Sequence, residues 1–411
     1  MITPAATRIL IVGCGFPQLG LLRFCRAEGL FVVGLDQNPR AVGRDLCDAF
    51  AAASTTDADG IARAVREHGA RGLTTGGSDH AVIPTARAAE ALGLPFYAES
   101  ARIAAAVHKD DMRALYARGG APSPAYRVVA SAAEAAAFVA EHGLPVVLKP
   151  ARGWGQRGVR VVMRPDELAP AIADALGAAG HVMDAPRCVL EAFIEGREFS
   201  FDAYTRDGAT EILAVTERII TGYPDPPGIT FAEVHPPELA DADRARVEAA
   251  AVAGLRALGY RRGPSYTQVR CGPRGAFVVE TALRLGGGLD PDVTLLASGV
   301  SLYRRIVGVA LGREDWERAG PEAPIHGGAT GRFLVGRPGR VRAVRGLDAA
   351  RAMPGVVDAQ AYVGPGDTVH PLTDGAKRAG HVLACGASRA EAEARAAAAM
   401  ALIEIDTTEA P

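Results

Sequence analysis

FVVETALRLGGG, residues 277–288, is the stretch from which the fold of this chain is best predicted. It begins as an apolar strand that carries Glu280 at or near its end, and Arg284 and the glycines Gly286 to Gly288 follow. A carboxylate can hold a hard cation, a guanidinium can stabilise a developing anion, and glycines let a ligand approach the backbone. The combination suits magnesium-held phosphate chemistry. A hairpin with a surface glutamate and a glycine turn fits the same pattern.

Composition limits the classes to which the protein can belong. Its 411 residues suggest two to four domains, and 48% hydrophobic and 22% charged residues are ordinary for a folded soluble protein. The net charge of −2 gives no sign of a nucleic-acid partner. No apolar run is long enough to span a membrane, and no signal-peptide pattern precedes the first strand. Six scattered cysteines without a C-x-x-C pair fit reduced thiols, so we expect a cytoplasmic protein.

Strand and helix patterns alternate over the first hundred residues. The predicted strands are 7–15, 30–36 and 72–77, and the predicted helices are 19–28, 61–68 and 81–92. Apolar runs separated by helices indicate a parallel sheet that is covered on both faces. Gly13, Gly15 and Asp36 invite a dinucleotide-binding interpretation. Gln18 stands where that pattern needs its third glycine, so a dehydrogenase is only a distant alternative.

A second glycine-rich segment is VVLKPARGWGQRGVRVV, residues 146–162. Lys149 ends its first strand, and the loop before the second strand holds Gly153, Gly155 and Gly158. A hairpin of this kind can place a lysine beside phosphates and lay backbone amides over them. It is not a Walker loop, because no Gly-Lys-Ser/Thr precedes a helix. A surface hairpin with a solvated lysine fits the same residues.

Two carboxylates, Glu191 and Glu198, flank an apolar triplet in CVLEAFIEGREFSF, residues 188–201. An extended segment of this type can hydrogen-bond a purine edge through its backbone. One acid can then accept from the exocyclic amine region and the other from ribose hydroxyls. An amphipathic strand pair with solvated acids is the alternative.

In this order, the segments resemble the ATP-grasp superfamily, and most closely its carboxylate–amine ligases, which include the L-amino-acid ligases. The resemblance covers nearly the whole chain and implies an α/β ATP-grasp fold. It implies an N-terminal Rossmann-like parallel-sheet domain over residues 1–108 and a lid domain over 109–189. A central nucleotide-binding α+β domain is expected over 190–324, and a C-terminal domain over 325–411.

The resemblance also implies the chemistry and the cofactors, ATP and Mg²⁺. A carboxylate would be activated as an acyl phosphate and joined to an amine in an amide bond, with release of ADP and phosphate. The residues expected to contact ATP are Lys109, Lys149, Gly153, Gly155, Gly158, Glu191, Phe193, Ile194 and Glu198. Gln268 and Glu280 occupy the positions of magnesium ligands. Lys149 and Arg284 are expected to be catalytic, because they would neutralise phosphate charge.

Two positions depart from the family pattern. Gln268 stands where many relatives have an acid, and Ala282 stands where the third ligand is usually Asn. One magnesium ion can still be held by Glu280, nucleotide oxygens and water. Because the third ligand is missing, a nucleotide-binding protein that no longer catalyses is an alternative interpretation.

The substrate side is expected in RIITGYPDPPGITFAEVHPPEL, residues 218–239, which resembles the substrate-side loops of amino-acid ligases. Arg218, Glu233 and His235 are candidates to hold a carboxylate or an α-amino group. His235 fits a structural histidine equally well. The prolines of the segment predict a rigid irregular loop rather than a helix.

The glycine turn completes the expected substrate site. Arg284, Gly287 and Gly288 are expected to contact the reacting groups. Asp290 and Asp292 follow the turn, where they can meet an amine or cap the next helix.

The C-terminal part is expected to complete the core and close one side of the site. GRFLVGRPGRVRAV, residues 331–344, predicts paired strands around a Pro-Gly turn, and 389–403 predicts an Ala-rich helix. The expected partners are a small-molecule carboxylate and amine, and the resemblance allows a homodimer. A purine-pathway-type ligase is the leading alternative among enzymes.

Overall fold

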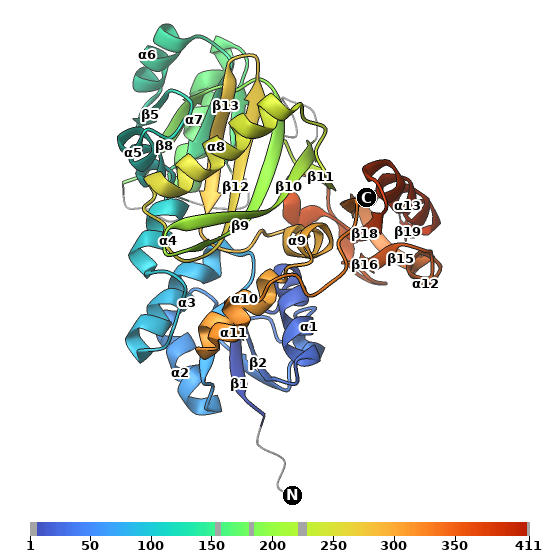
Figure 1. The fold of residues 1–411 in the computed structure, drawn as a ribbon. Coiled ribbons are helices and arrows are strands. Elements are labelled where there is room, and N and C mark those ends of the chain that lie inside the picture. The colour runs from blue at the N-terminus through green and yellow to red at the C-terminus, as the bar shows by residue number, and fades with distance from the viewer. Residues whose placement is uncertain (1–5, 153–157, 181–184, 221–227, 409–411) are drawn as a thin grey trace, which may run out of the picture.

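The computed structural model describes residues 6–152, 158–180, 185–220 and 228–408 (Figure 1). The N-terminal part lies at the bottom of Figure 1 and the lid at the top, with the central sheet between them. The C-terminal strands and helices lie to one side. The α/β character predicted from the sequence is confirmed by the helices and strands that follow.

The N-terminal part is a parallel sheet in the order β3-β2-β1-β4. Its elements are β1 Arg8–Val12, α1 Leu19–Ala27, β2 Phe31–Asp36, β3 Ala49–Ala52, α2 Ala58–His68, β4 Gly72–Thr75 and α3 Asp79–Leu92, with short 3-10 turns at Phe16–Gln18 and Arg44–Leu46. Ile9 and Ile11 pack under α1, whereas Leu10 and Val12 pack under α2 and α3. Both faces of the sheet are covered, which explains its continuous apolar strands.

The acid that suggested a dinucleotide site stabilises its own loop. The Asp36 carboxylate accepts hydrogen bonds from the backbone N–H groups of Cys14 and Asn38, both at 2.9 Å. Gly13 has φ of +90°, a conformation that favours glycine. The glycine turn therefore directs the chain into the turn Phe16–Gln18, which reaches the candidate site described below.

The lid is a small sheet in the order β5-β8-β6-β7 with two helices packed on it. Its elements are β5 Tyr126–Val129, α6 Ala132–His142, β6 Val146–Pro150, β7 Arg160–Val162, the 3-10 turn Pro165–Glu167, α7 Leu168–Gly180 and β8 Cys188–Ala192, and the preceding helices are α4 Ser100–Val107 and α5 Lys109–Gly119. β6 and β7 pair antiparallel, so the predicted pairing of these two strands is confirmed. The expected boundary between residues 189 and 190 falls inside β8.

A long antiparallel sheet in the order β13-β12-β9-β10-β11-β14-β18-β16 forms the centre. The elements of its first part are β9 Arg197–Arg206, β10 Ala209–Ile220, β11 Thr230–His235, α8 Asp241–Ala257, β12 Gly263–Gly272, β13 Gly275–Ala282, α9 Asp290–Ser298, α10 Leu302–Leu311 and α11 Glu314–Glu317. α8 packs on β12 and β13. α10 returns to the N-terminal sheet, where Leu302 and Ile306 share a core with Ile9 and Ile11.

The segment 218–239 is not wholly irregular, as its prolines had suggested. Arg218 lies near the end of β10, and the whole of β11 follows. Residues 221–227 lie outside the described residues. The prediction was wrong for β11 because the prolines stand outside its short alternating run, where they remove no ladder hydrogen bond.

The C-terminal strands extend the central sheet through the pairing of β11 with β14. The elements are β14 Gly328–Leu334, β15 Gly339–Arg345, α12 Leu347–Arg351, β16 Val356–Ala361, β17 Thr368–Val369, the 3-10 turn Gly375–Lys377, β18 Gly380–Gly386, α13 Arg389–Leu402 and β19 Glu404–Thr407. The predicted helix corresponds to α13. The predicted pairing of β14 with β15 was wrong, because β11 and β18 occupy both edges of β14. β15 pairs with β17 and β19 instead.

The helices α9 and α10 form a bent, apolar pair. Within the described ranges, no single helix is long and apolar enough to cross a membrane. Only α9 and α10 together reach that length and composition, and the chain bends by 107° between them.

Gly77, in the N-terminal part, packs against the glycine turn that follows β13, and the contact leaves no room for a side chain on Gly77. A Cβ atom on Gly77 would lie 2.0 Å from the carbonyl oxygen of Gly286 and 2.4 Å from Cα of Gly287. Both neighbours are backbone atoms, so a larger residue must displace the turn. Gly77 is thus required for the close approach of the two segments.

We predict that Gly77→Ala lowers stability by about 1–3 kcal/mol, the usual cost of overpacking a well-packed contact. Thermal unfolding monitored by circular dichroism measures the change. Gly177→Ala is the matched control, because a Cβ atom at this exposed position of α7 meets no atom within 4 Å. The control should be neutral or slightly stabilising. Equal midpoints of thermal unfolding for the two variants would show that Gly77 is not required for the close contact.

Candidate active site

A cavity of about 500 Å³ opens where the N-terminal, central and C-terminal parts meet. Five residues expected at the site from the sequence line it: Arg218, Gln268, Glu280, Arg284 and Gly287. The structure therefore brings together residues from β10, β12, β13 and the glycine turn. The N-terminal part contributes Phe16, Pro17, Gly77, Ser78, Asp79 and His80, and the C-terminal part contributes Tyr362, Asp374, Gly375, Ala376 and Arg378.

Gln268 and Glu280 stand opposite each other on the paired strands β12 and β13. Directly opposed residues in an antiparallel pair project from the same face of the sheet. A register shift follows Gln268, as expected where a β-bulge redirects side chains. One carboxylate and one amide oxygen beside a cavity fit magnesium, which prefers oxygen ligands and retains water. Ala282, two residues after Glu280, is buried and adds no ligand.

Arg284 is fixed by a bidentate ion pair with Asp79, the first residue of α3. Its Nε and Nη2 donate to the two Asp79 carboxylate oxygens at 2.7 and 2.8 Å, and its Nη1 donates to the Leu285 carbonyl oxygen at 2.7 Å. Burial would raise the pKa of Asp79, but the Arg284 guanidinium holds that pKa below its usual value. Within the described contacts, two of the five N–H donors of Arg284 remain for an anion.

Asp79 was not singled out in the sequence analysis, although a local signal was present. It comes after β4 with three residues between them, in GGSDH at residues 76–80, and opens a helix. Carboxyl ends of parallel strands are common positions for site residues. Tyr362 and Arg378 carried no comparable signal, because they come from irregular segments of the C-terminal part.

Lys149 and Glu191 belong to a buried charge network that ties the lid to the central sheet. Glu191 accepts from Lys149 Nζ at 2.8 Å and from Arg113 Nε at 2.7 Å. Arg113 also donates to the carbonyl oxygens of Val278 and Val279 on β13, at 3.0 and 2.7 Å. Burial alone would raise the pKa of Glu191, but Arg113 and Lys149 lower it to about 2. Arg113 thus connects Lys149 with β13, the strand that carries Glu280, and no sequence motif had marked it.

Glu198 and Arg218 form a second buried ion pair. Arg218 Nε donates to Glu198 Oε1 at 2.8 Å, and Arg270 Nε lies 3.8 Å from Glu198 Oε2. Arg218 also contacts the hydroxyl groups of Tyr266 and Thr230. Arg218 therefore lines the cavity as a guanidinium whose position is fixed from three sides.

The expected nucleotide residues lie on the lid side, outside the lining of this cavity. Lys109 opens α5, and its backbone N–H donates to the Ala151 carbonyl oxygen at 3.1 Å. The backbone N–H of Phe193 donates to the Pro145 carbonyl oxygen at 3.2 Å, and Ile194 is buried. Gly158 has φ of +72°. The expected lid glycines Gly153 and Gly155 lie outside the described residues.

Glu233 and His235 do not line the cavity. Glu233 lies behind the glycine turn, because a Cβ atom on Gly288 would come within 2.7 Å of its Oε1. Burial and the neighbouring Asp290 raise the pKa of Glu233 to about 8. Asp290 Oδ2 accepts from the backbone N–H of Gly288 at 3.0 Å, so it braces the turn. Nδ1 of His235 lies 2.9 Å from the Val215 carbonyl oxygen, a contact typical of a structural histidine.

We predict that Glu191→Gln destabilises the protein at pH 7 by about 3–5 kcal/mol, because it leaves two buried cations without their counter-ion. The folded pKa of Glu191 is depressed to about 2. Its stabilising contribution is therefore present above the unfolded value near 4.5 and is lost as pH falls toward 2. Urea unfolding at pH 7 and pH 3 measures both effects.

Glu141→Gln is the matched control for that substitution. This substitution removes the ion pair between Glu141 and Arg127 in the same lid. The Glu141 side chain is 57% exposed and the Arg127 side chain is 39% exposed. The effect of Glu141→Gln should stay below about 1 kcal/mol. A Glu191→Gln variant as stable as this control at pH 7 would show that the Glu191 network does not hold the lid.

Comparison with known proteins supports the fold and names the family. Residues 142–292 match the model of the ATP-grasp domain, and residues 332–408 match L-amino acid ligase C-terminal domain 2. An L-amino acid ligase from Bacillus licheniformis superposes with a TM-score of 0.82 at 20% identity, covering 99% of this chain and 100% of that one. A phosphoribosylglycinamide synthetase from Anaerococcus prevotii superposes with a TM-score of 0.75 at 16% identity, covering 98% and 100%.

Two sequence relatives extend this comparison. An uncharacterized protein of Sinorhizobium fredii is 33% identical over 72% of this chain, which spans 60% of that relative's length. A phosphoribosylamine–glycine ligase of Caulobacter vibrioides is 32% identical over 77% of this chain and 75% of its own length. The chain therefore belongs to the ATP-grasp family of carboxylate–amine ligases, and its C-terminal region is the one found in L-amino acid ligases.

Proposed function

We propose that the protein is an ATP-dependent ligase that joins an amino acid to an amine through an acyl phosphate, with release of ADP and phosphate. One observation carries the proposal. Gln268, Glu280 and Arg284, which would serve the phosphate, line one cavity of about 500 Å³. The match of residues 332–408 to an L-amino acid ligase domain supports an amino-acid substrate.

The first step would be attack of a substrate carboxylate on the γ-phosphate of ATP. Little covalent help is needed in such a step, so positioning and neutralisation of charge dominate. Magnesium, when bound by Gln268 and Glu280, would supply part of that neutralisation. Lys149 would supply another part from the lid side, provided that it exchanges its contact with Glu191 for a phosphate oxygen.

Arg284 would act on the acyl phosphate and on the tetrahedral species that follows. Asp79 and the Leu285 carbonyl oxygen hold the guanidinium in place, and the remaining N–H groups can donate to an oxyanion. A donor that is fixed before the charge develops costs no reorganisation during the reaction. Asp79 is therefore a positioning residue for Arg284.

The second step would be attack of a neutral amine on the acyl carbon, with phosphate as the leaving group. Water must be kept away, because it would hydrolyse the acyl phosphate. The cavity is walled by parts of three regions of the chain, and Phe16 and Tyr362 place aromatic rings at its wall. The amine of a phosphorylated ribose, as in a purine-pathway substrate, is the second candidate, and the similarity to a phosphoribosylamine–glycine ligase favours it.

The carboxylate and the amine would be the small-molecule partners of the protein. Its six cysteines are free thiols, which fits work in a reducing cytoplasm.

In the presence of magnesium, we expect the protein to release phosphate from ATP only when a carboxylate substrate and an amine substrate are both present. The assay screens pools of amino acids and, separately, phosphoribosylamine with glycine, and mass spectrometry identifies the product. Amide, ADP and phosphate in equal amounts would establish the ligase. ATP binding without release in any pool would contradict it and favour a nucleotide-binding protein.

We predict that Arg284→Ala lowers kcat by at least about a hundredfold, the usual cost of removing one fixed oxyanion donor. The Kd for ATP should change less than threefold, because the nucleotide residues lie on the lid side. Steady-state kinetics and calorimetry measure the two quantities. Arg127→Ala, at an exposed arginine of the lid, is the control. Unchanged turnover in Arg284→Ala would remove Arg284 from the mechanism.

A further inference from the structure

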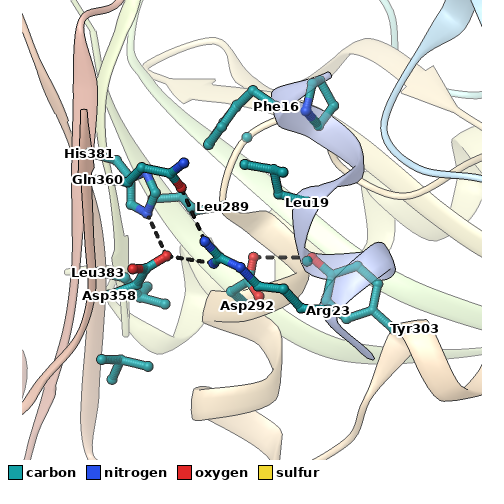
Figure 2. A pocket seen from close by; sticks show the side chains of 14 residues that line it. Phe16, Leu19, Arg23, Leu289, Asp292, Tyr303, Asp358, Gln360, His381 and Leu383 are labelled. Carbon is teal, nitrogen blue, oxygen red and sulfur yellow. Dashed lines mark hydrogen bonds and ion pairs between the residues drawn. The ribbon is translucent and has the colours of Figure 1, made fainter. Parts of the chain in front are cut away.

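A second cavity, of about 230 Å³, lies next to the candidate active site (Figure 2). It is enclosed by α1, the start of α9 and the strands β16 and β18. Phe16 and Pro17 line both cavities, and Gly288 lines this one while its neighbour Gly287 lines the other. The two cavities therefore meet at the glycine turn and at the turn Phe16–Gln18.

Aromatic side chains line the two cavities where they meet. The rings of Phe16 and Tyr362 lie 4.1 Å apart, and Tyr362 faces the first cavity. Behind them, the Tyr362 hydroxyl lies 2.9 Å from Nδ1 of His381, which lines the second cavity. Phe16, Gly287 and Gly288 therefore mark the boundary between the two spaces.

One carboxylate in the second cavity already has a cation and a second hydrogen-bonding partner. Asp358 Oδ2 lies 2.8 Å from Nη1 of Arg23 and 3.2 Å from Nε2 of His381. Arg23 also donates to Oε1 of Gln360 at 3.3 Å. Burial alone would raise the pKa of Asp358, but His381 and Arg23 hold it below its usual value. Asp358 therefore needs no further cation.

The other carboxylate, Asp292, faces the cavity without such a partner. Tyr303 donates its hydroxyl to Asp292 Oδ2 at 3.1 Å, and no ion pair to Asp292 is formed within the described part of the chain. Burial raises the pKa of Asp292 to about 6, so it is mostly charged at neutral pH. The charge of Arg23, which pairs with Asp358, favours the ionised form of Asp292 without a direct ion pair between the two. A partly buried carboxylate of this kind can accept a further cation from the space in front of it. Figure 2 shows the Asp292 and Tyr303 contact on one side of Arg23 and the Asp358 contacts on the other.

Building on the proposed function, we propose that the second cavity is a subsite for the amine substrate and receives a second, cationic amino group at its far end. The reacting amine would lie in the first cavity near Arg284. A short alkyl chain would pass beside Gly287 and Gly288, and its terminal ammonium would pair with Asp292 and Tyr303. The volume, below that of pockets for drug-sized ligands, suits such a short chain. The preferred amine is then a diamine or a basic amino acid.

The test compares acceptors that differ only in the terminal ammonium, L-lysine against L-norleucine and L-ornithine against L-norvaline. With saturating ATP and carboxylate substrate, wild type should show at least a tenfold higher kcat/KM for the cationic member of a pair. Asp292→Asn, which keeps shape and the hydrogen bond to Tyr303, should reduce that ratio at least tenfold through KM. Asp348→Asn, whose side chain is 98% exposed, should leave the ratio unchanged.

Equal use of cationic and neutral acceptors by wild type would overturn the subsite. A ratio unaffected by Asp292→Asn would overturn it as well. A second measurement separates failure of the subsite from failure of the ligase reaction. Thermal shift with 1,5-diaminopentane against 1-aminopentane reports binding without turnover, and the diamine should stabilise wild type but not Asp292→Asn. No difference between these two amines would also overturn the proposal, whereas a selective shift without any product would contradict the ligase reaction alone.

Discussion

The ion pair between Arg284 and Asp79 joins two positions that are 205 residues apart in the chain and defines the candidate site. A buried guanidinium needs a counter-ion, and here the counter-ion comes from the helix that follows the last strand of the N-terminal sheet. Because the pair is bidentate, it fixes orientation as well as distance. The glycine contact at Gly77 lets the two backbones approach closely enough for this pair to form. The walls of the larger cavity depend on this junction.

A similar constraint operates on the lid side. Glu191 neutralises Lys149 and Arg113, and Arg113 reaches the carbonyl groups of β13. β13 also carries Glu280, so one strand links the buried lid charges to the magnesium position that we propose. In both places a cation that we propose to bind phosphate is paired with a single carboxylate. An arriving phosphate can then share or replace that partner without moving the cation far.

Most of the elements and site segments that the sequence predicted correctly were predicted from local patterns. The Glu280 to Gly288 stretch, the hairpin around Lys149 and the alternating N-terminal strands depend on neighbouring residues, and the structure has these elements as expected. Asp79, Arg113 and Arg378 could not be assigned in this way, because their roles arise from contacts across more than a hundred residues. The wrong pairing of β14 with β15 has the same origin. A Pro-Gly turn favours a hairpin locally, but the edges of β14 were already occupied by more distant strands.

We infer that Gln268, Glu280 and Arg284 surround a carboxylate that becomes an acyl phosphate. The most direct measurement uses an amino-acid substrate labelled with ¹⁸O in its carboxylate and follows the label by mass spectrometry of the released phosphate. An acyl phosphate must transfer one carboxylate oxygen to phosphate, so we predict one ¹⁸O atom in each phosphate formed with the amide. Phosphate without ¹⁸O, released together with amide, would show that the carboxylate is activated by another route and would contradict the account.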